Sequence, residues 1–289
     1  MAGFAHRAAA SGRKVSILSV LVVFSLCAML AACLDVKREA EDDDLVNARK
    51  AMMQREFLEA EKSFERYLRR NPEGAERWEV WNSLVDIALS VRNVRQGAIE
   101  LLEAMLLEYE DDLAKKRNVS VRLAEQYRLV RNYDRAVFLW TSIAEDTKAS
   151  NIDRAEACRN QASIYLRRLE FELAKQTLGN CLAFDIPIAL RGQCLYDLAQ
   201  THVGMEELDN AIIQLRVVLT LKDLPESMRT LTVFMLADAV EQQGKIDEAT
   251  TLFTSISETY PNRKVVDERL LALRRKAAVK AAEPKTRRN

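Results

Sequence analysis

The side chains best suited to covalent chemistry in this 289-residue chain are its five cysteines. Cys27 and Cys33 lie at the end of an apolar stretch near the N-terminus, whereas Cys158, Cys181 and Cys194 lie far along the chain. A cysteine thiol can be acylated, can join a second thiol in a disulfide, or can be buried as a small apolar side chain. The five cysteines therefore raise two separate questions, one about the N-terminus and one about the interior.

Among the interior cysteines, Cys181 has two partners within reach. Facing residues of antiparallel neighbouring helices have numbers that add up to a nearly constant value. A turn near residue 169 therefore brings Cys158 opposite Cys181, and a turn near residue 187 brings Cys194 opposite it. We expect Cys181 to form a disulfide with Cys194 or with Cys158 if the chain reaches an oxidising compartment. The alternative is that all three are buried apolar side chains.

Other reactive groups are scarce. Of the two histidines, His6 lies at the extreme N-terminus and His202 lies at a position that faces the core of an expected helix. A single histidine there is better explained as a packed, hydrogen-bonded core residue than as a metal ligand. The sequence contains no glycine-rich phosphate loop, no Gly-x-Ser-x-Gly and no His-Glu-x-x-His. We therefore predict that the protein is not an enzyme and uses no cofactor.

The first 32 residues have the features of an export signal. They contain three basic residues and no acidic one, and an apolar run over 15–32 ends in Leu-Ala-Ala before Cys33. This ending resembles the bacterial lipobox, in which the cysteine is acylated and becomes the first residue of the mature protein. We predict a signal peptide over 1–32 and a lipidated Cys33 followed by a short tether to residue 41.

The alternative is an uncleaved anchor, for which 18 apolar residues are at the short limit. Both interpretations place the remaining chain outside the cytoplasm. Leu34 follows Cys33, and by resemblance to lipoprotein sorting in enteric-type bacteria this favours the inner leaflet of the outer membrane, facing the periplasm. Loss of the leader removes three of 43 basic residues and none of 43 acidic ones. A slightly acidic mature chain gives no support for nucleic-acid binding.

The elements that position these residues follow from a repeat. A small residue recurs at steps of 37, 39, 38, 37 and 38 residues, at Ala60, Gly97, Ala136, Ala174, Ala211 and Ala249. Larger apolar residues recur three before and four and seven after each small residue, which places them on one face of a helix. A second apolar set, twelve and nine residues upstream, forms the face of another helix. Each repeat is therefore an A helix followed by a B helix, and neighbouring repeats complete each other's core.

This pattern resembles the tetratricopeptide repeat (TPR). The third repeat carries it most fully, with Leu123, Ala124, Tyr127, Tyr133, Ala136 and Trp140. The period is longer than the usual 34 residues. The resemblance implies an all-α, TPR-like α-solenoid of about six helix-turn-helix repeats over 42–262. A capping helix over 263–280 follows it, and then a basic, disordered tail over 281–289.

In the resemblance, side chains beside the core face of the A helices line a concave groove that binds peptides. The matching positions here are Asn82, Asp86, Glu125, Arg128, Arg159, Ser163, Arg167, Tyr196, Gln200, Phe234 and Asp238. Three of them are arginines, which can bind a carboxylate through two parallel hydrogen bonds. The alternative is an ordinary solvated face with salt bridges between successive helical turns.

These features predict a lipid-anchored scaffold that binds proteins or peptides on the periplasmic side of the envelope. Such a scaffold would assist assembly of an envelope, pilus or secretion complex, and would reach the membrane through the lipid on Cys33. The alternative function is that of a regulator or adaptor of a cell-wall enzyme with the same fold. The sequence makes no prediction about the oligomeric state or the identity of the partner.

Overall fold

The computed structural model describes residues 43–282, which form helices and turns and contain no strand within that range. The predicted signal peptide, Cys33 and its tether lie outside the described residues, as do residues 283–289 of the predicted tail. The described residues divide into two compact units, and the division falls between Leu101 and Leu102.

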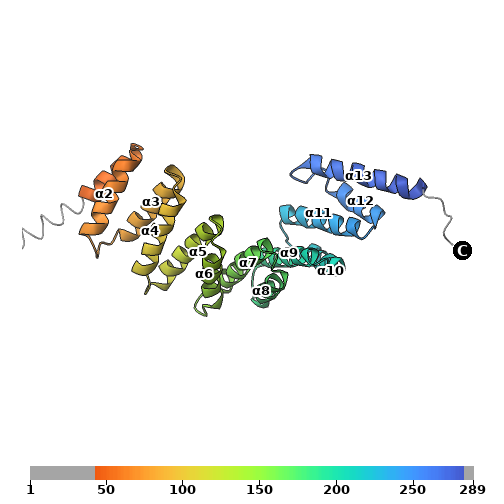
Figure 1. Cartoon of the computed structure of the whole chain (residues 1–289), viewed down its shortest axis with the longest axis horizontal. Coiled ribbons are helices and arrows are strands. Elements are labelled where there is room, and N and C mark those ends of the chain that lie inside the picture. Colours follow the sequence, from red (N-terminus) through yellow and green to blue (C-terminus); the bar gives the residue numbers. More distant parts are fainter. Residues whose placement is uncertain (1–42, 283–289) are drawn as a thin grey trace, which may run out of the picture. The chain divides into compact units, whose positions relative to one another are not determined.

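The helices follow one another as antiparallel hairpins, with a first helical segment at 43–53 that precedes the labelled ones (Figure 1). In chain order they are α2 (Phe57–Arg70), α3 (Arg77–Asp86), the π-helix η1 (Ile87–Val91), α4 (Arg95–Glu108), α5 (Leu113–Leu129), α6 (Tyr133–Glu145), α7 (Asn151–Arg167), α8 (Phe171–Ala183), α9 (Ile188–Gly204), α10 (Leu208–Thr220), α11 (Glu226–Gln242), α12 (Ile246–Ser255) and α13 (Arg263–Ala282). The predicted all-α fold of helix-turn-helix repeats is confirmed.

Each turn between an A helix and its B helix contains one residue in the left-handed backbone region. These residues recur at steps of 37 or 38 along the chain, at Arg55, Asn93, Arg131, Leu169, Glu206 and Gly244. Only the last is a glycine, which adopts a positive φ without the steric cost that a Cβ brings. Five of the six repeats therefore maintain the same turn with a side chain that disfavours it, because the packing of the two helices determines the turn.

The small residues meet at the centre of the repeats, with one correction to the register. Ala60, Ala136, Ala174, Ala211 and Ala249 are all fully buried. In the second repeat the fully buried small residue is Ala98, and the predicted Gly97 is only half-buried. With Ala98 in place, the steps along the chain become 38, 38, 38, 37 and 38 residues.

The π-helix η1 explains this shift. In the other repeats twelve residues separate the small residues of the A and B helices, whereas thirteen separate the buried Val85 from Ala98. A π-helical turn inserts one extra residue into a helix, and η1 lies between these two positions. The buried residues that follow are accordingly Leu102 and Met105, and the predicted Leu101 and Ala104 are only partly buried.

Arginines near the start of A helices satisfy the ends of the preceding B helices. The last carbonyls of a helix have no partner within it. Arg191 of α9 donates from Nη2 to the carbonyl of Phe184 at 3.1 Å and from Nη1 to that of Leu182 at 3.4 Å. Corresponding bonds to carbonyls are made by Arg77, Arg154 and Arg229. These bonds fix each A helix against the repeat before it.

The last helix, α13, covers the apolar side of α11 and α12. Its Val266 and Leu273 are fully buried in the same cluster as Phe253 of α12. Its Arg269 and Lys276 form ion pairs at 2.8 and 2.7 Å with Glu241 of α11, whose side chain is buried. Among the described helices, none combines the length and the hydropathy that a bilayer crossing requires.

Candidate binding groove

The A helices of the second unit form the framework of the candidate site. In this unit α7 packs beside α9, and α9 packs beside α11. One hollow of about 370 Å³ lies along α7 and α9; we call it the arginine hollow, and its lining consists of Arg159, Asn160, Ser163, Leu166, Arg167, Asp197 and Gln200. Four of these seven side chains are positions that the sequence predicted for the groove.

Arg159 is already bonded within the protein. Its Nε donates to Oδ2 of Asp197 at 2.7 Å, and its Nη1 donates to Oε1 of Gln193 at 3.1 Å, so it bridges α7 and α9. Burial raises the pKa of the Asp197 carboxyl, and the nearby Arg159 guanidinium partly opposes this shift. The prediction that Arg159 is available to clamp a ligand carboxylate therefore needs correction, because its Nε is taken by Asp197.

Arg167 and Gln200 offer hydrogen-bonding capacity that the described residues do not use. Both side chains are exposed, and neither has a hydrogen-bond or ion-pair partner in the described part of the chain. The arginine hollow thus contains two guanidinium groups and one carboxylate, and the Arg167 guanidinium is unneutralised. Guanidinium groups suit carboxylates because two parallel N–H donors match the two carboxylate oxygens.

A second hollow, of about 540 Å³, continues from the first through the shared residue Gln200. We call it the aromatic hollow, and its lining consists of Tyr196, Gln200, Val203, Leu231, Phe234, Met235, Asp238, Tyr260, Val265 and Arg269. Its side chains come from α9, α11, α13 and the segment before α13. The predicted groove residues Tyr196, Gln200, Phe234 and Asp238 all line it.

The aromatic side chains of this hollow are held by one another. Phe234 stacks on Tyr260 with ring centroids 4.6 Å apart and meets Phe253 edge to face at 5.3 Å. Burial raises the pKa of the Tyr196 hydroxyl. The single acidic group, Asp238, forms an ion pair with Arg269 and accepts a hydrogen bond from Gln242. The hollow is therefore a preformed apolar surface with no unneutralised charge among its lining residues.

The remaining predicted groove residues are not part of these hollows. Arg128 of α5 forms a two-fold hydrogen-bonded pair with Glu125, three residues earlier on the same helix. Here the alternative interpretation, a solvated face with salt bridges, describes the structure better. Asn82 donates from Nδ2 to the carbonyl of Trp78, and it lies with Asp86 in the first unit.

Several lining residues were missed by the sequence analysis. Asp197 lies 38 residues after Arg159, one repeat further along, and equivalent positions of adjacent A helices lie side by side. Opposite charges one period apart were therefore a usable signal. Tyr260 and Arg269 come from the capping region, where the repeat pattern ends and gives no register to follow.

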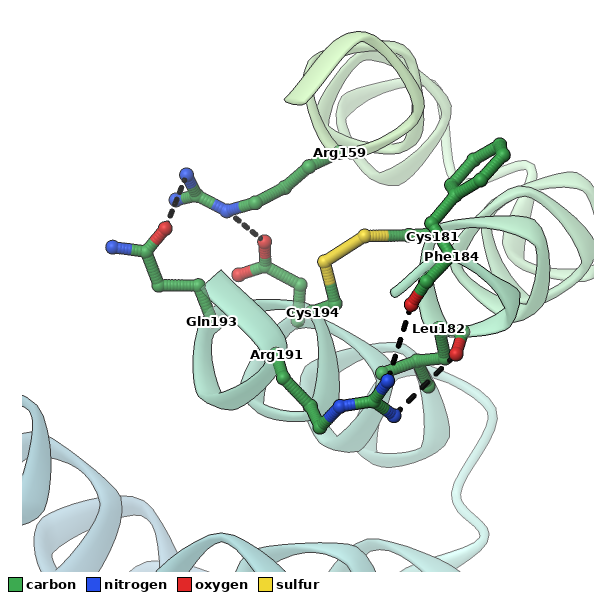
Figure 2. Close-up of a disulfide and its surroundings, with 8 residues drawn as sticks. Arg159, Cys181, Leu182, Phe184, Arg191, Gln193 and Cys194 are labelled. Atoms are coloured by element: carbon green, nitrogen blue, oxygen red, sulfur yellow. Dashed lines mark hydrogen bonds and ion pairs between the residues drawn. A yellow bond between two sulfur atoms is a disulfide. The ribbon is translucent and has the colours of Figure 1, made fainter. Parts of the chain in front are cut away.

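The disulfide lies beneath this site. Cys181 of α8 is joined to Cys194 of α9, with Cα atoms 6.5 Å apart. Figure 2 shows that Gln193, the neighbour of Cys194, faces the Arg159 guanidinium. Cys158 is a free, buried cysteine, and its pKa is raised by burial to about 11. Of the two pairings considered, the structure has the one with Cys194.

His202 is buried at 8% exposure, and its Nδ1 lies 2.7 Å from Oε2 of Glu207. Hydrogen bonds from Asn210 and His202 hold the pKa of Glu207 below its ordinary value. No group of three or more histidine, cysteine or acidic side chains within the described residues is arranged to hold a metal ion.

The stacked hairpins define a helical-repeat solenoid of the TPR class, and solved structures share this fold. The chain resembles MamA of Desulfovibrio magneticus RS-1 with a TM-score of 0.51 and 17% identity, over 64% of this chain and 95% of that one. It resembles the TPR-like repeats of a Podosopora anserina kinesin light chain with a TM-score of 0.52 and 19% identity, over 71% and 97%. For yeast Tom70 the TM-score is 0.55 and the identity 14%, over 78% and 45%. No protein-family model and no curated protein matches the sequence.

Proposed function

We propose that this protein is a lipid-anchored repeat scaffold of the cell envelope that binds a segment of a partner protein along the arginine and aromatic hollows. The observation that carries the proposal is the gathering of seven predicted groove positions from α7, α9 and α11 into two adjoining hollows. Arg167 and Gln200 add unused hydrogen-bonding groups at the point where the hollows meet.

The chemistry of the groove suits binding of an extended chain. Stacked aromatic rings supply large, rigid apolar contacts, which dominate the energetics of protein interfaces. An exposed amide such as Gln200 can donate to a carbonyl and accept from an N–H of a bound backbone. The site needs no conformational change to present these groups, because the Arg159–Asp197 bridge and the ring stacking already order its walls.

The location in the envelope rests on separate support. Leu-Ala-Ala-Cys at 30–33 follows a basic start and an apolar run, the pattern of an exported and acylated protein. The Cys181–Cys194 disulfide is compatible with export, because disulfides persist in oxidising compartments. In this arrangement the lipid on Cys33 holds the repeats at the periplasmic face of the outer membrane, where the groove positions components of an envelope, pilus or secretion complex.

Arg167→Glu tests the binding site. The full-length tagged chain is cross-linked in intact cells, and the cross-linked partners of the wild type and the variant are compared by mass spectrometry. Because the Arg167 side chain is exposed and unpaired, its replacement should leave the fold intact and remove the partner. Arg274→Glu is the matched control, since Arg274 is an exposed arginine of α13 that lines neither hollow. Equal loss, or no loss, in both variants contradicts the proposed site.

Cys33→Ser tests the anchor. Cells that are grown with radiolabelled palmitate should label the wild-type chain and not the variant, and the variant should leave the membrane fraction. Acyl chains contribute about 0.8 kcal/mol for each buried methylene group, so loss of the lipid has a large effect on partitioning. Label on the Cys33→Ser chain, or a variant that stays in the membrane fraction, contradicts the lipid anchor.

A further inference from the structure

We infer that the bound segment carries an acidic side chain followed two residues later by a large apolar one, with the acidic group in the arginine hollow and the apolar group in the aromatic hollow. This inference rests on the proposed function and specifies the partner of the same groove. It assigns the two hollows to two different side chains of one extended strand.

The acidic position follows from the charge of the arginine hollow. Asp197 neutralises Arg159 through a bond of 2.7 Å, and both groups are held between α7 and α9. Arg167 is left as an exposed cation without a partner in the described chain. A carboxylate that enters this hollow gains a charge-assisted, two-pronged hydrogen bond from Arg167. A cationic side chain would meet an unneutralised guanidinium.

The apolar position follows from the composition of the aromatic hollow. Its charged lining groups, Asp238 and Arg269, are paired with each other. The rest of its wall is largely aliphatic and aromatic, and Leu231 remains 38% exposed at its edge. With a volume of about 540 Å³, the hollow is large enough for an aromatic or long aliphatic side chain. Burial of such a side chain gains about 25 cal/mol for each Å² removed from water.

The spacing follows from Gln200, which lines both hollows. In an extended segment, alternate side chains point to the same side, so residues two apart lie about 6.6 Å from each other. Two such side chains can enter adjoining hollows, and the backbone between them passes over the unpaired Gln200 amide. Hydrogen bonds from that amide to the backbone fix the register and do not depend on the partner's sequence.

A displayed library of random twelve-residue peptides tests the inference against the full-length protein in detergent. The wild type should enrich peptides with Asp or Glu two residues before Phe, Trp, Tyr, Leu or Met. Arg167→Glu should weaken a selected peptide about tenfold and remove the acidic preference. Leu231→Ser should weaken the same peptide and leave the acidic preference in place. Arg274→Glu, and Leu58→Ser at an exposed position of α2, are the matched controls and should bind as the wild type does.

Each other outcome overturns the inference. Peptides without an acidic residue, an acidic preference that survives Arg167→Glu, or a different spacing all contradict the assignment of the hollows. A library that yields no binder also contradicts it. The proposed function is judged separately, by loss of cross-linked partners in cells carrying Arg167→Glu. If that loss occurs and the library fails, the groove binds a partner that lacks this acidic and apolar pair.

Discussion

Arg159 of α7 and Asp197 of α9 form an ion pair of 2.7 Å although they are 38 residues apart. The separation is one repeat period, so the pair joins equivalent positions of adjacent A helices. It forms the floor of the arginine hollow and leaves Arg167 as the unneutralised cation of the site. The bond therefore determines which arginine of the groove is available to a ligand.

The buried end of this pair predicts a pH dependence. Burial raises the pKa of Asp197, and Arg159 partly opposes the shift. Because the native state then binds the proton more tightly than the unfolded chain, the free energy of unfolding is greatest below the unfolded pKa of about 3.9. It falls as the pH rises through the raised pKa of Asp197. Asp197→Asn removes this contribution, so the variant should lose less stability over that interval.

Thermal unfolding of both chains between about pH 4 and pH 7 measures the difference. The titration of the Asp197 carboxyl by NMR gives the pKa directly, with the exposed Asp247 of α12 as an internal reference. Superimposable stability curves, or a titration midpoint for Asp197 below that of Asp247, would contradict the predicted shift.

The Cys181–Cys194 disulfide predicts a stability difference between oxidised and reduced protein. The bridge closes a short loop, with a sequence separation of 13 residues. Loops of about this length contribute about 3 kcal/mol by restricting the unfolded chain. Reduction, or Cys194→Ser, should therefore lower the free energy of unfolding by about that amount. Cys158→Ala should have a smaller effect, about 1 kcal/mol, since it removes one buried sulfur and no cross-link.

Mass spectrometry without reduction provides the chemical check. The peptides that contain Cys181 and Cys194 should appear linked, with a loss of two hydrogens. Cys158 should react with iodoacetamide only after denaturation, because it is 3% exposed and its pKa is about 11. A linked peptide that contains Cys158 contradicts the pairing in the structure.

Two helical glycines predict opposite effects of the same substitution. A Cβ on Gly204 would lie 2.3 Å from Cε1 of Phe171, so Gly204→Ala should lower stability by about 1–3 kcal/mol through overpacking. A Cβ on Gly179, within α8, would meet nothing within 4 Å. Gly179→Ala should therefore raise stability by about 1 kcal/mol, the difference in helix propensity. Circular dichroism during heating measures both, and shifts of the same sign would contradict the packing of α9 on Phe171.

The fold was predictable because its signals repeat. The buried alanines of the B helices and the prolines before α9 and α11 each indicate the same boundaries, since Pro187 and Pro225 precede those helices directly. The register failed at Gly97 and Ala98, where two small residues are adjacent and a π-helix adds one residue. A fixed spacing cannot detect such an insertion, because only hydrogen-bonded backbone geometry distinguishes a π-turn from an α-turn.

The groove was predictable where the A helices follow the repeat and not where side chains interact with one another. The positions on α7, α9 and α11 face the two hollows as expected. On α5, Glu125 and Arg128 satisfy each other, a local choice that their spacing allows but does not require. Tyr260 and Arg269 lie beyond the last repeat, so no periodic position could reveal them.

The central claim is that a partner protein occupies the groove at Gln200. The most direct measurement places a photo-crosslinking amino acid at position 200 in one strain and at position 213 in another. Ile213 is 56% exposed on α10 and lines neither hollow. Irradiation of intact cells should give a discrete cross-linked product from position 200, lost in combination with Arg167→Glu, and none from position 213. Equal products from both positions, or a product at position 200 that survives Arg167→Glu, would contradict the account.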